Sequence, residues 1–423
     1  MTLRRLQPHQ VAGLRREAVD ESTLARAAEI VRDVREGGGA AVRRFAETFG
    51  EREAGQPLVI EQPEMLGALN DLPGEQRALL ERTAGRIEAF ALSQRAALAG
   101  LTVPVPGGEA GHTITPVERA GCYAPGGRYP LPSSVLMTAV TARTAGVDEV
   151  WVASPRPAPI TLAAAAVAGA DGLLAVGGAH AIAALAHGVG GPPRCDVVVG
   201  PGNRWVTAAK KLVAGEVGID MLAGPSELVV LADHTADAGV VAADLLAQAE
   251  HDPEALPVLV TTDSALADAV EREIERQLAG LPTRDIAGAA LRNGFIVVAD
   301  SLEEAVSVCD RLAPEHLQIL TEGAEEVARH LNHYGGLFIG GTSAEVFGDY
   351  GIGPNHTLPT GGVARFKGGL SVFDFLRIRT WLRMEDGPAT AAAVRDAAAL
   401  ARLEGLEAHA RAAERRSRLD TEV

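Results

Sequence analysis

The chain has 423 residues, of which 47% are hydrophobic and 22% charged, and it carries a formal net charge of -16 at pH 7. This length is sufficient for two or three domains with buried cores. An acidic chain without a run of Lys and Arg repels phosphate groups, so we expect neither a nucleic acid nor a membrane partner. The apolar stretches are also shorter than the roughly 20 residues that span a bilayer.

The N-terminus and the cysteines bear on the cellular compartment. No apolar segment follows Arg4 and Arg5, so we expect no secretory signal. Cys122, Cys195 and Cys309 are isolated in the sequence and lack the spacing of a zinc knuckle or a disulfide scaffold. We therefore expect a cytoplasmic protein with reduced thiols.

Helical spacing of apolar residues predicts surface helices over residues 21–49 and 75–98, and Pro and Gly break the pattern over residues 101–111. From residue 148 the chain changes to short β-branched runs that end in Gly, each followed by an Ala-rich amphipathic stretch. Three such strand–helix units are predicted, at residues 149–169, 172–188 and 195–213.

A second set of the same kind follows Gly218. Its strands and helices are predicted at residues 227–232 with 236–250, 258–262 with 265–279, 294–299 with 302–312, and 317–321 and 337–340 around 324–331. Such alternation implies parallel sheets covered by helices. We therefore predict an α/β chain of two similar Rossmann-like parallel-sheet lobes, with N-terminal helices and a C-terminal helical arm.

The C-terminal region is predicted to contain no strand after Gly369, and residues 391–418 form a long helical stretch rich in Ala, Arg and Glu. An arm of this kind either grips a second subunit or packs as a surface helix, and both remain open. The expected division is an N-terminal segment at residues 1–20, a first lobe at 21–117 with 228–368, a second lobe at 118–227, and the arm at 369–423.

Glycine-rich turns at helix starts are the first candidates for chemistry. A G-x-G-x-x-G fingerprint between a strand and a helix is not found. Backbone N–H groups at Gly177-Gly178 and at Gly200-Pro201-Gly202-Asn203 could hold a phosphate. Close packing of strand against helix is the commoner reason for such glycines.

Several acidic, imidazole and amide side chains form the second group of candidates. Glu315 and His316 place an acid beside a base just before a predicted strand, although such adjacency arises by chance more often than by catalysis. Gln248 and His251 share a helix face at i and i+3. A mixed set of nitrogen and oxygen ligands could bind zinc in a catalytic site, but spacing alone does not select its members. The further candidates are Asp349 and His356 in a Gly/Pro-rich loop and Glu404 and His409 on the terminal helix.

Six sequence strings, taken together, resemble the histidinol dehydrogenase family in order and spacing from about residue 115 to the C-terminus. They are GCYAPGGR from residue 121, VGPGN from 199, GIDMLAGPSE from 218, ADLLAQAEHD from 243, APEHL from 313, and GDY with GPNHTLPTGG between 348 and 362. Six such strings in one order are highly specific.

The resemblance implies a zinc ion held by Gln, His and Asp of one subunit and by His from the arm of its partner. The matching positions are Gln248, His251, Asp349 and His409. The acid–base pair of the family falls on Glu315 and His316. Substrate contacts, in addition to His316 and the metal ligands, fall on Ser226, His356 and Glu404.

The resemblance also implies NAD contacts at Tyr123 and Asn203, within the lobe of residues 118–227. The third contact falls on His180, where the family usually has Gln. Because His titrates near neutrality and is rigid, cofactor affinity or its pH dependence is expected to differ. Trp205 stands where a Tyr is usual.

The implied function is the four-electron oxidation of L-histidinol, via L-histidinaldehyde, to L-histidine with two NAD, at the end of histidine biosynthesis. His316 would take the hydroxyl proton and Glu315 would activate water, in a homodimer with shared active sites. One alternative is a paralogous zinc- and NAD-dependent alcohol dehydrogenase for another substrate, such as a sulfonated diol. Glu404 favours histidinol, because a carboxylate attracts an ammonium group and repels a sulfonate. The other alternative, an inactive zinc- or nucleotide-binding module, is disfavoured by the presence of both Glu315 and His316.

Overall fold

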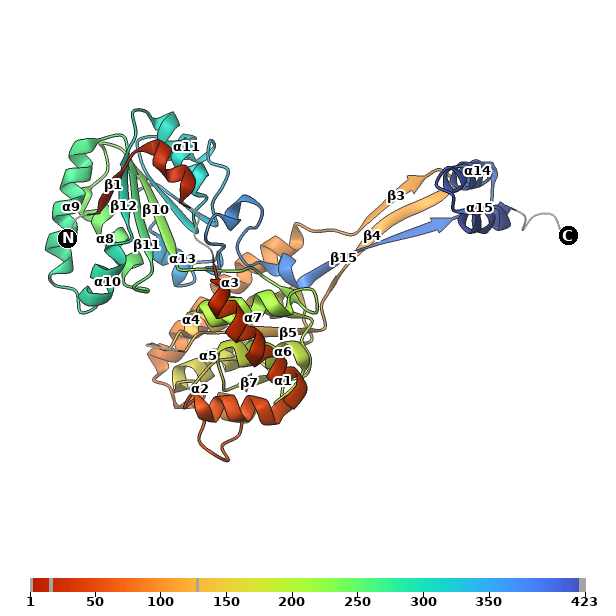
Figure 1. Ribbon diagram of the computed structural model, residues 1–423, viewed down its shortest axis with the longest axis horizontal. Coiled ribbons are helices and arrows are strands. Elements are labelled where there is room, and N and C mark those ends of the chain that lie inside the picture. The colour runs from red at the N-terminus through yellow and green to blue at the C-terminus, as the bar shows by residue number, and fades with distance from the viewer. Residues whose placement is uncertain (1–2, 15–17, 127–128, 418–423) are drawn as a thin grey trace. The chain divides into compact units, whose positions relative to one another are not determined.

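Two parallel sheets organise most of the chain in the computed structural model, which describes residues 3–14, 18–126 and 129–417 (Figure 1). The chain divides into two units, Met1–Gln94 with Val117–Phe375 and Arg95–Pro116 with Leu376–Val423. Gly127, Arg128 and Arg418, which belong to segments named above, lie outside the described residues. No described helix has both the length and the apolar character needed to cross a lipid bilayer.

The first sheet has the strand order β2-β7-β6-β5-β8-β9. Counted from β5, its parallel strands follow the order 3-2-1-4-5 of a Rossmann-like fold. β2 adds an antiparallel edge, with Ile60 opposite Leu173. The strands are β2 (Val59–Glu61), β5 (Arg119–Tyr123), β6 (Glu149–Ala153), β7 (Gly172–Leu174), β8 (Val197–Val199) and β9 (Gly218–Ile219).

Helices cover this sheet. α1, which bends at Gly38 (φ +58°), packs against α6 and α7, while α2 packs against α5. Arg26 of α1 lies over the ring of Trp205 on α7, 5.9 Å from its centroid. The helices around this sheet are α1 (Glu21–Thr48), α2 (Gln62–Asp71), α4 (Pro132–Ala145), α5 (Pro159–Val167), α6 (Gly178–His187) and α7 (Arg204–Val213). α3 (Gly74–Ala96) instead contacts the loop at Gly351, whose backbone oxygen accepts from Arg86 (2.8 Å).

The grouping of residues 21–71 differs from the expected one, in which they joined the sheet of residues 228–368. β2 pairs with β7, and the apolar stripe of α1, including Val31 and Val34, shares one core with Ile182 and Val206. The spacing of apolar residues predicts which face of a helix is buried, but it does not identify the sheet against which that face packs.

The second sheet is entirely parallel, with the order β1-β12-β11-β10-β13-β14, so the order 3-2-1-4-5 recurs from β10. Its strands are β1 (Arg4–Leu6), β10 (Glu227–Ala232), β11 (Leu256–Thr261), β12 (Phe295–Val298), β13 (His316–Leu320) and β14 (Gly336–Ile339). Its helices are α8 (Ala238–Ala249), α9 (Ser264–Leu278), α10 (Arg284–Leu291), α11 (Leu302–Leu312), α12 (Ala324–Ala328) and α13 (Glu345–Asp349). The prediction of two similar Rossmann-like parallel-sheet lobes is confirmed.

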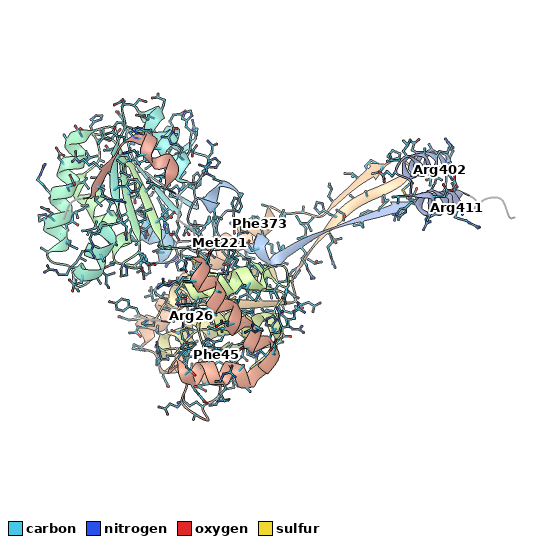
Figure 2. The ribbon with its side chains drawn as sticks, viewed as in Figure 1. Arg26, Phe45, Met221, Phe373, Arg402 and Arg411 are labelled. Carbon is cyan, nitrogen blue, oxygen red and sulfur yellow. The ribbon has the colours of Figure 1, made fainter. Side chains whose placement is uncertain are left out.

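The second unit contains an antiparallel sheet of order β15-β4-β3 and a pair of helices. Arg402 binds Glu407 and Glu414 across the turn between these helices, and Arg411 also binds Glu407 (Figure 2). Its elements are β3 (Leu101–Val105), β4 (Gly108–Pro116), β15 (Leu376–Met384), α14 (Pro388–Leu403) and α15 (Glu407–Glu414). Short 3-10 turns elsewhere are η1 (Pro8–Gly13), η2 (Val363–Arg365), η3 (Val372–Phe375) and η4 (Arg415–Ser417).

Two expectations for this unit are wrong, and a third feature, a hairpin, was not predicted. The segment broken by Pro and Gly forms a hairpin that turns at Gly107 (φ +85°), and a strand follows Gly369 where none was expected. β15 alternates Arg with apolar residues, and most of its side chains are exposed, so it lacks the buried β-branched run that marks the other strands. The predicted single helix is also interrupted at Gly405 (φ +79°).

Candidate active site

The amino ends of β10 and β13 bring the predicted acid and base together. These strands are neighbours, with Leu228 opposite His316. The Glu315 carboxylate accepts hydrogen bonds from Ser226 Oγ (2.6 Å) and from the backbone N–H of Glu227 (2.8 Å). Glu315 is buried, and its orientation is fixed by these two donors.

The contacts of His316 define which ring nitrogen can react. Its Nδ1 lies 3.1 Å from the backbone oxygen of Glu227, which only accepts, so Nδ1 donates and carries the proton. Its Nε2 has no hydrogen-bond partner among the described residues, and the nearest oxygen of Asp349 is 3.6 Å away. A buried imidazole, 3% exposed, therefore presents one unpaired nitrogen.

Burial and charge act in opposite directions on this pair. Burial lowers the pKa of His316, but the negative charges of Glu315 and Asp349 outweigh burial and raise it to about 10. Burial raises the pKa of Glu315, partly offset by His316 and Ser226. A cation bound at these carboxylates would shift His316 back towards the neutral form that accepts a proton, because like charges disfavour protonation.

A set of potential metal ligands lies where the end of α8 meets α13. His251 Nε2 is 3.2 Å from an oxygen of Asp349. One ligand atom from each of His251, Glu345 and Asp349 falls within 4.8 Å of the others. Gln248 precedes His251 on the last turn of α8, where the negative end of the helix dipole favours a cation.

Unpaired buried groups in this set fit a metal ion. The Gln248 side chain is 0% exposed, and neither its oxygen nor its nitrogen has a hydrogen-bond partner among the described residues. The same holds for both carboxylate oxygens of Glu345, which is 1% exposed. Buried polar groups without partners are costly, and a divalent cation would satisfy them through nitrogen and oxygen ligands of the kind zinc accepts.

His356 is tied to the same cluster. Its Nδ1 lies 2.9 Å from the backbone oxygen of Asp349, so Nδ1 donates, and its Nε2 is 3.5 Å from Ser134 Oγ. Burial lowers the pKa of His356, partly offset by Asp349. The adjacent Asn355 donates to the backbone oxygen of Met137 on α4, which anchors this loop. His356 therefore offers a neutral, acceptor nitrogen at Nε2.

Tyr123 and Asn203 lie at the carboxyl ends of β5 and β8, the strands between which the order of the first sheet reverses. Ligands of open α/β sheets bind at such a switch point. The Asn203 side chain caps α7 by accepting from the N–H groups of Trp205 and Val206. A Cβ on Gly200 (φ +118°) would lie 2.0 Å from the backbone oxygen of Tyr123, so only glycine allows this close approach.

The backbone N–H groups of the Gly177-Gly178 turn, which were candidates for binding a phosphate, already donate hydrogen bonds to side chains of this chain. The N–H of Gly177 donates to the Glu51 carboxylate (3.1 Å), and the N–H of Gly178 donates to the Tyr123 hydroxyl (3.2 Å). The same Glu51 oxygen is 2.9 Å from His180 Nε2. His180 is 1% exposed, and its ring lies close to the ring of Phe45 on α1 and to that of Phe49 just beyond the end of α1, with centroids 5.8 and 5.5 Å away.

The second unit carries the remaining predicted residues. Glu404 ends α14 and His409 belongs to α15, and both are exposed. The other predicted acid, base and metal-binding residues belong to the first unit, where Gln248 lies one turn before His251. A continuous series of contacts joins Ser226, Glu315, His316, Asp349, His251 and His356.

Sequence reasoning missed three residues beside these sites. Glu345 lies four residues before Asp349, a helical spacing that becomes visible only once α13 is known. Lys210 and Asp220 form a buried ion pair that binds both backbone groups of Gly200. A lysine within the apolar run of a predicted helix is the signal that could have found this pair.

Comparisons with known proteins agree over nearly the whole chain. The sequence model of the histidinol dehydrogenase family matches residues 14–417. The histidinol dehydrogenase of Thermus thermophilus is 47% identical over 385 residues, covering 90% of this chain and 92% of that protein. That of Aromatoleum aromaticum is 43% identical over 399 residues, covering 93% of this chain and 91% of that protein.

A solved structure of a histidinol dehydrogenase also matches this chain over nearly its whole length. The crystal structure of histidinol dehydrogenase from Elizabethkingia anophelis matches with a TM-score of 0.91 at 30% identity and covers 98% of both chains. Neither alternative, a dehydrogenase for a sulfonated diol or an inactive binding module, is supported by these matches. The chain belongs to the histidinol dehydrogenase family, a family of oxidoreductases of histidine biosynthesis.

Proposed function

We propose that this chain oxidises L-histidinol to L-histidine in two steps. In the first, the alcohol and NAD give L-histidinaldehyde, NADH and a proton; in the second, the aldehyde, water and NAD give the carboxylate, NADH and two protons. The observation that carries the proposal is the buried Nε2 of His316, which lies between Glu315 and a set of potential metal ligands and has no hydrogen-bond partner in the described part of the chain. The first reaction needs a base, and the second needs an activated water.

The metal site is proposed to consist of Gln248, His251 and Asp349, completed by His409 of the partner subunit. Bound there, zinc would fix and polarise the substrate, and bound NAD would accept hydride in both steps. The unpaired amide of Gln248 and the spacing of His251 and Asp349 support a cation at this position.

The acid–base roles follow from the hydrogen bonds of each residue. His316 takes the hydroxyl proton at Nε2, because the carbonyl of Glu227 keeps the other proton on Nδ1. Glu315 takes a proton from the water that adds to the aldehyde carbon, while Ser226 and the N–H of Glu227 hold its carboxylate in place.

A covalent route through cysteine has no support. All three thiols are buried, and burial raises the pKa of Cys122 to about 12 and raises the pKa of Cys195 and Cys309 as well. A thiol in that state is a poor nucleophile for an aldehyde. The buried, unpaired thiols also support the proposed cytoplasmic location.

Substrate is proposed to contact Ser226, His316, His356 and the metal ligands, with Glu404 attracting its ammonium group. NAD is proposed to contact Tyr123 and Asn203 at the switch point of the first sheet. His180 is retained as the third contact, although in this conformation its Nε2 faces Glu51. The side chain must change partner, or Glu51 must move, for that contact to form.

A homodimer with shared sites is supported by exposed apolar side chains in both units. Leu403 of α14 is 84% exposed, and Ile378 and Leu382 of β15 are exposed as well. In the first unit, exposed apolar residues flank Asp349; they are Phe347, Tyr350 and Ile352. Surfaces of this kind mark protein interfaces.

NADH formation by the zinc-loaded protein tests the proposal, with L-histidinol and dihydroxypropanesulfonate supplied in parallel, before and after chelation. We expect two NADH per histidinol consumed and loss of turnover after chelation. Turnover of the sulfonate alone would discard the proposed substrate but retain the site.

A further inference from the structure

A short connector, residues 224–227, supplies the hydrogen bonds that orient the acid–base pair. Ser226 Oγ and the backbone N–H of Glu227 both donate to the Glu315 carboxylate. The backbone oxygen of Glu227 accepts from Nδ1 of His316. The positions of Glu315 and His316 therefore depend on the conformation of this connector.

Two reciprocal hydrogen bonds tie the connector to the loop that follows His356. The N–H of Gly224 donates to Thr360 Oγ1 (2.5 Å), and the N–H of Gly361 donates to Glu227 Oε1 (3.1 Å). Gly361 has a φ of +63°, a conformation that favours glycine. The loop thus holds the connector near both of its ends.

Both side chains that make this tie are buried. Thr360 is 2% exposed and Glu227 is 6% exposed, so water competes little for either bond. A buried carboxylate costs free energy that its hydrogen bonds must offset, and an apolar side chain would fill the same space without that cost. The carboxylate at position 227 is therefore better explained by what it holds in place than by packing.

We propose that Glu227 is a positioning residue, whose carboxylate fixes the peptide groups that orient Glu315 and His316. The inference rests on the proposed function, because it takes Glu315 as the group that activates water and His316 as the base. Two of the three bonds from the connector act on Glu315. The aldehyde step therefore depends on Glu227 more than the alcohol step does.

The ratio of NADH formed to L-histidinol consumed tests this inference. The assay uses the full-length, zinc-loaded protein, with semicarbazide present to trap any aldehyde that leaves the site. Glu227→Ala removes the acceptor of the Gly361 N–H, whereas Glu227→Gln keeps an acceptor oxygen. Thr360→Val removes the hydroxyl at nearly constant size.

Asp233→Asn is the matched control. Asp233 lies just beyond the carboxyl end of β10, the strand that begins with Glu227. Its carboxylate also accepts from a backbone N–H, that of Glu322 just after β13 (2.9 Å). The control thus alters a similar contact at the opposite end of the same two strands.

We expect Glu227→Ala to lower kcat by about 100-fold with KM for histidinol within a few-fold, because a small displacement of catalytic groups costs about that much. The yield should fall from two towards one NADH per histidinol, with semicarbazone making up the difference. Thr360→Val should act in the same direction by about tenfold and add little to Glu227→Ala, since both act on one connector. Glu227→Gln and Asp233→Asn should still yield two NADH.

A variant that merely misfolds loses active protein, but the remaining enzyme still yields two NADH per histidinol. A yield of two in Glu227→Ala would therefore overturn the inference, and so would equal losses in Glu227→Ala and Glu227→Gln or in Glu227→Ala and Asp233→Asn. If the unaltered protein does not yield two NADH per histidinol, the proposed function fails instead.

Discussion

His316 is held by one hydrogen bond and surrounded by carboxylates, and these contacts decide which of its nitrogens can act as the proposed base. The carbonyl of Glu227 fixes the proton on Nδ1, so Nε2 is the nitrogen proposed to meet the substrate. Replacing His316→Asn keeps a polar side chain but removes the base. We expect kcat to fall by about 10²- to 10⁴-fold, the usual contribution of general base catalysis. Steady-state NADH formation measures this, and unchanged zinc content serves as the control; a loss below tenfold would contradict the assignment.

The sequence could predict this pair only through its resemblance to a family. Adjacency of Glu315 and His316 is uninformative by itself, because their hydrogen-bond partners, Ser226 and Glu227, lie at the start of another strand. Glu345 could not be predicted at all, because what sets it apart is burial without a hydrogen-bond partner among the residues that the structure describes. Neither burial nor pairing across strands can be read from spacing.

The Glu51–His180 contact is a second feature at the scale of single residues. Glu51 accepts from the N–H of Gly177 and so brings a negative charge to the start of α6. That charge opposes the phosphates of a cofactor bound nearby. We expect Glu51→Ala to tighten NAD binding by about three- to tenfold, because the variant lacks the repulsion between the Glu51 carboxylate and the cofactor phosphates.

Equilibrium titration of the protein with NAD, followed by calorimetry, measures that change. Glu53→Ala is the control, because Glu53 is an exposed carboxylate in the same loop. Weaker binding in Glu51→Ala would contradict the prediction and make Glu51 a contact of the cofactor's ribose hydroxyls instead.

At the scale of elements, the strand–helix units were predictable because each buried strand reads as a short apolar run and each helix as an Ala-rich stretch. The turn after β8 was predictable as a loop, but the buried ion pair that stabilises it was not. Lys210 of α7 and Asp220 meet within the core and together bind the backbone N–H and carbonyl of Gly200. This pair positions the turn that carries Asn203.

We expect Lys210→Met to destabilise the first sheet and its helices by about 3–5 kcal/mol, because it leaves the Asp220 carboxylate buried and unpaired. Urea unfolding followed by tryptophan fluorescence should show a lower midpoint. Lys211→Met is the matched control, since Lys211 is the next residue and is exposed. If both variants unfold at the same urea concentration, the buried pair does not stabilise the turn.

For the whole molecule, the predicted lobes were right in architecture, while the predicted boundaries missed an entire antiparallel sheet. β15 lies far in the sequence from the hairpin of β3 and β4, and its register against β4, such as Ile114 opposite Ile378, has no local signature. The residues proposed for the site likewise come from both units. Glu404 and His409 belong to the second unit, and the other proposed metal and substrate ligands belong to the first.

The proposed sharing of active sites between two subunits makes a specific prediction for mixed dimers. His316→Asn disables the base of one subunit, and the double change Glu404→Ala with His409→Ala disables the arm that serves its partner. In a heterodimer of these two chains, isolated through different affinity tags, one site contains both defects and the other contains none. We expect about half the NADH formation rate of the unaltered dimer, because symmetry gives two equal sites, while each variant homodimer stays near background. Heterodimers no more active than the homodimers would mean that each arm serves its own subunit, since every site would then hold one defect.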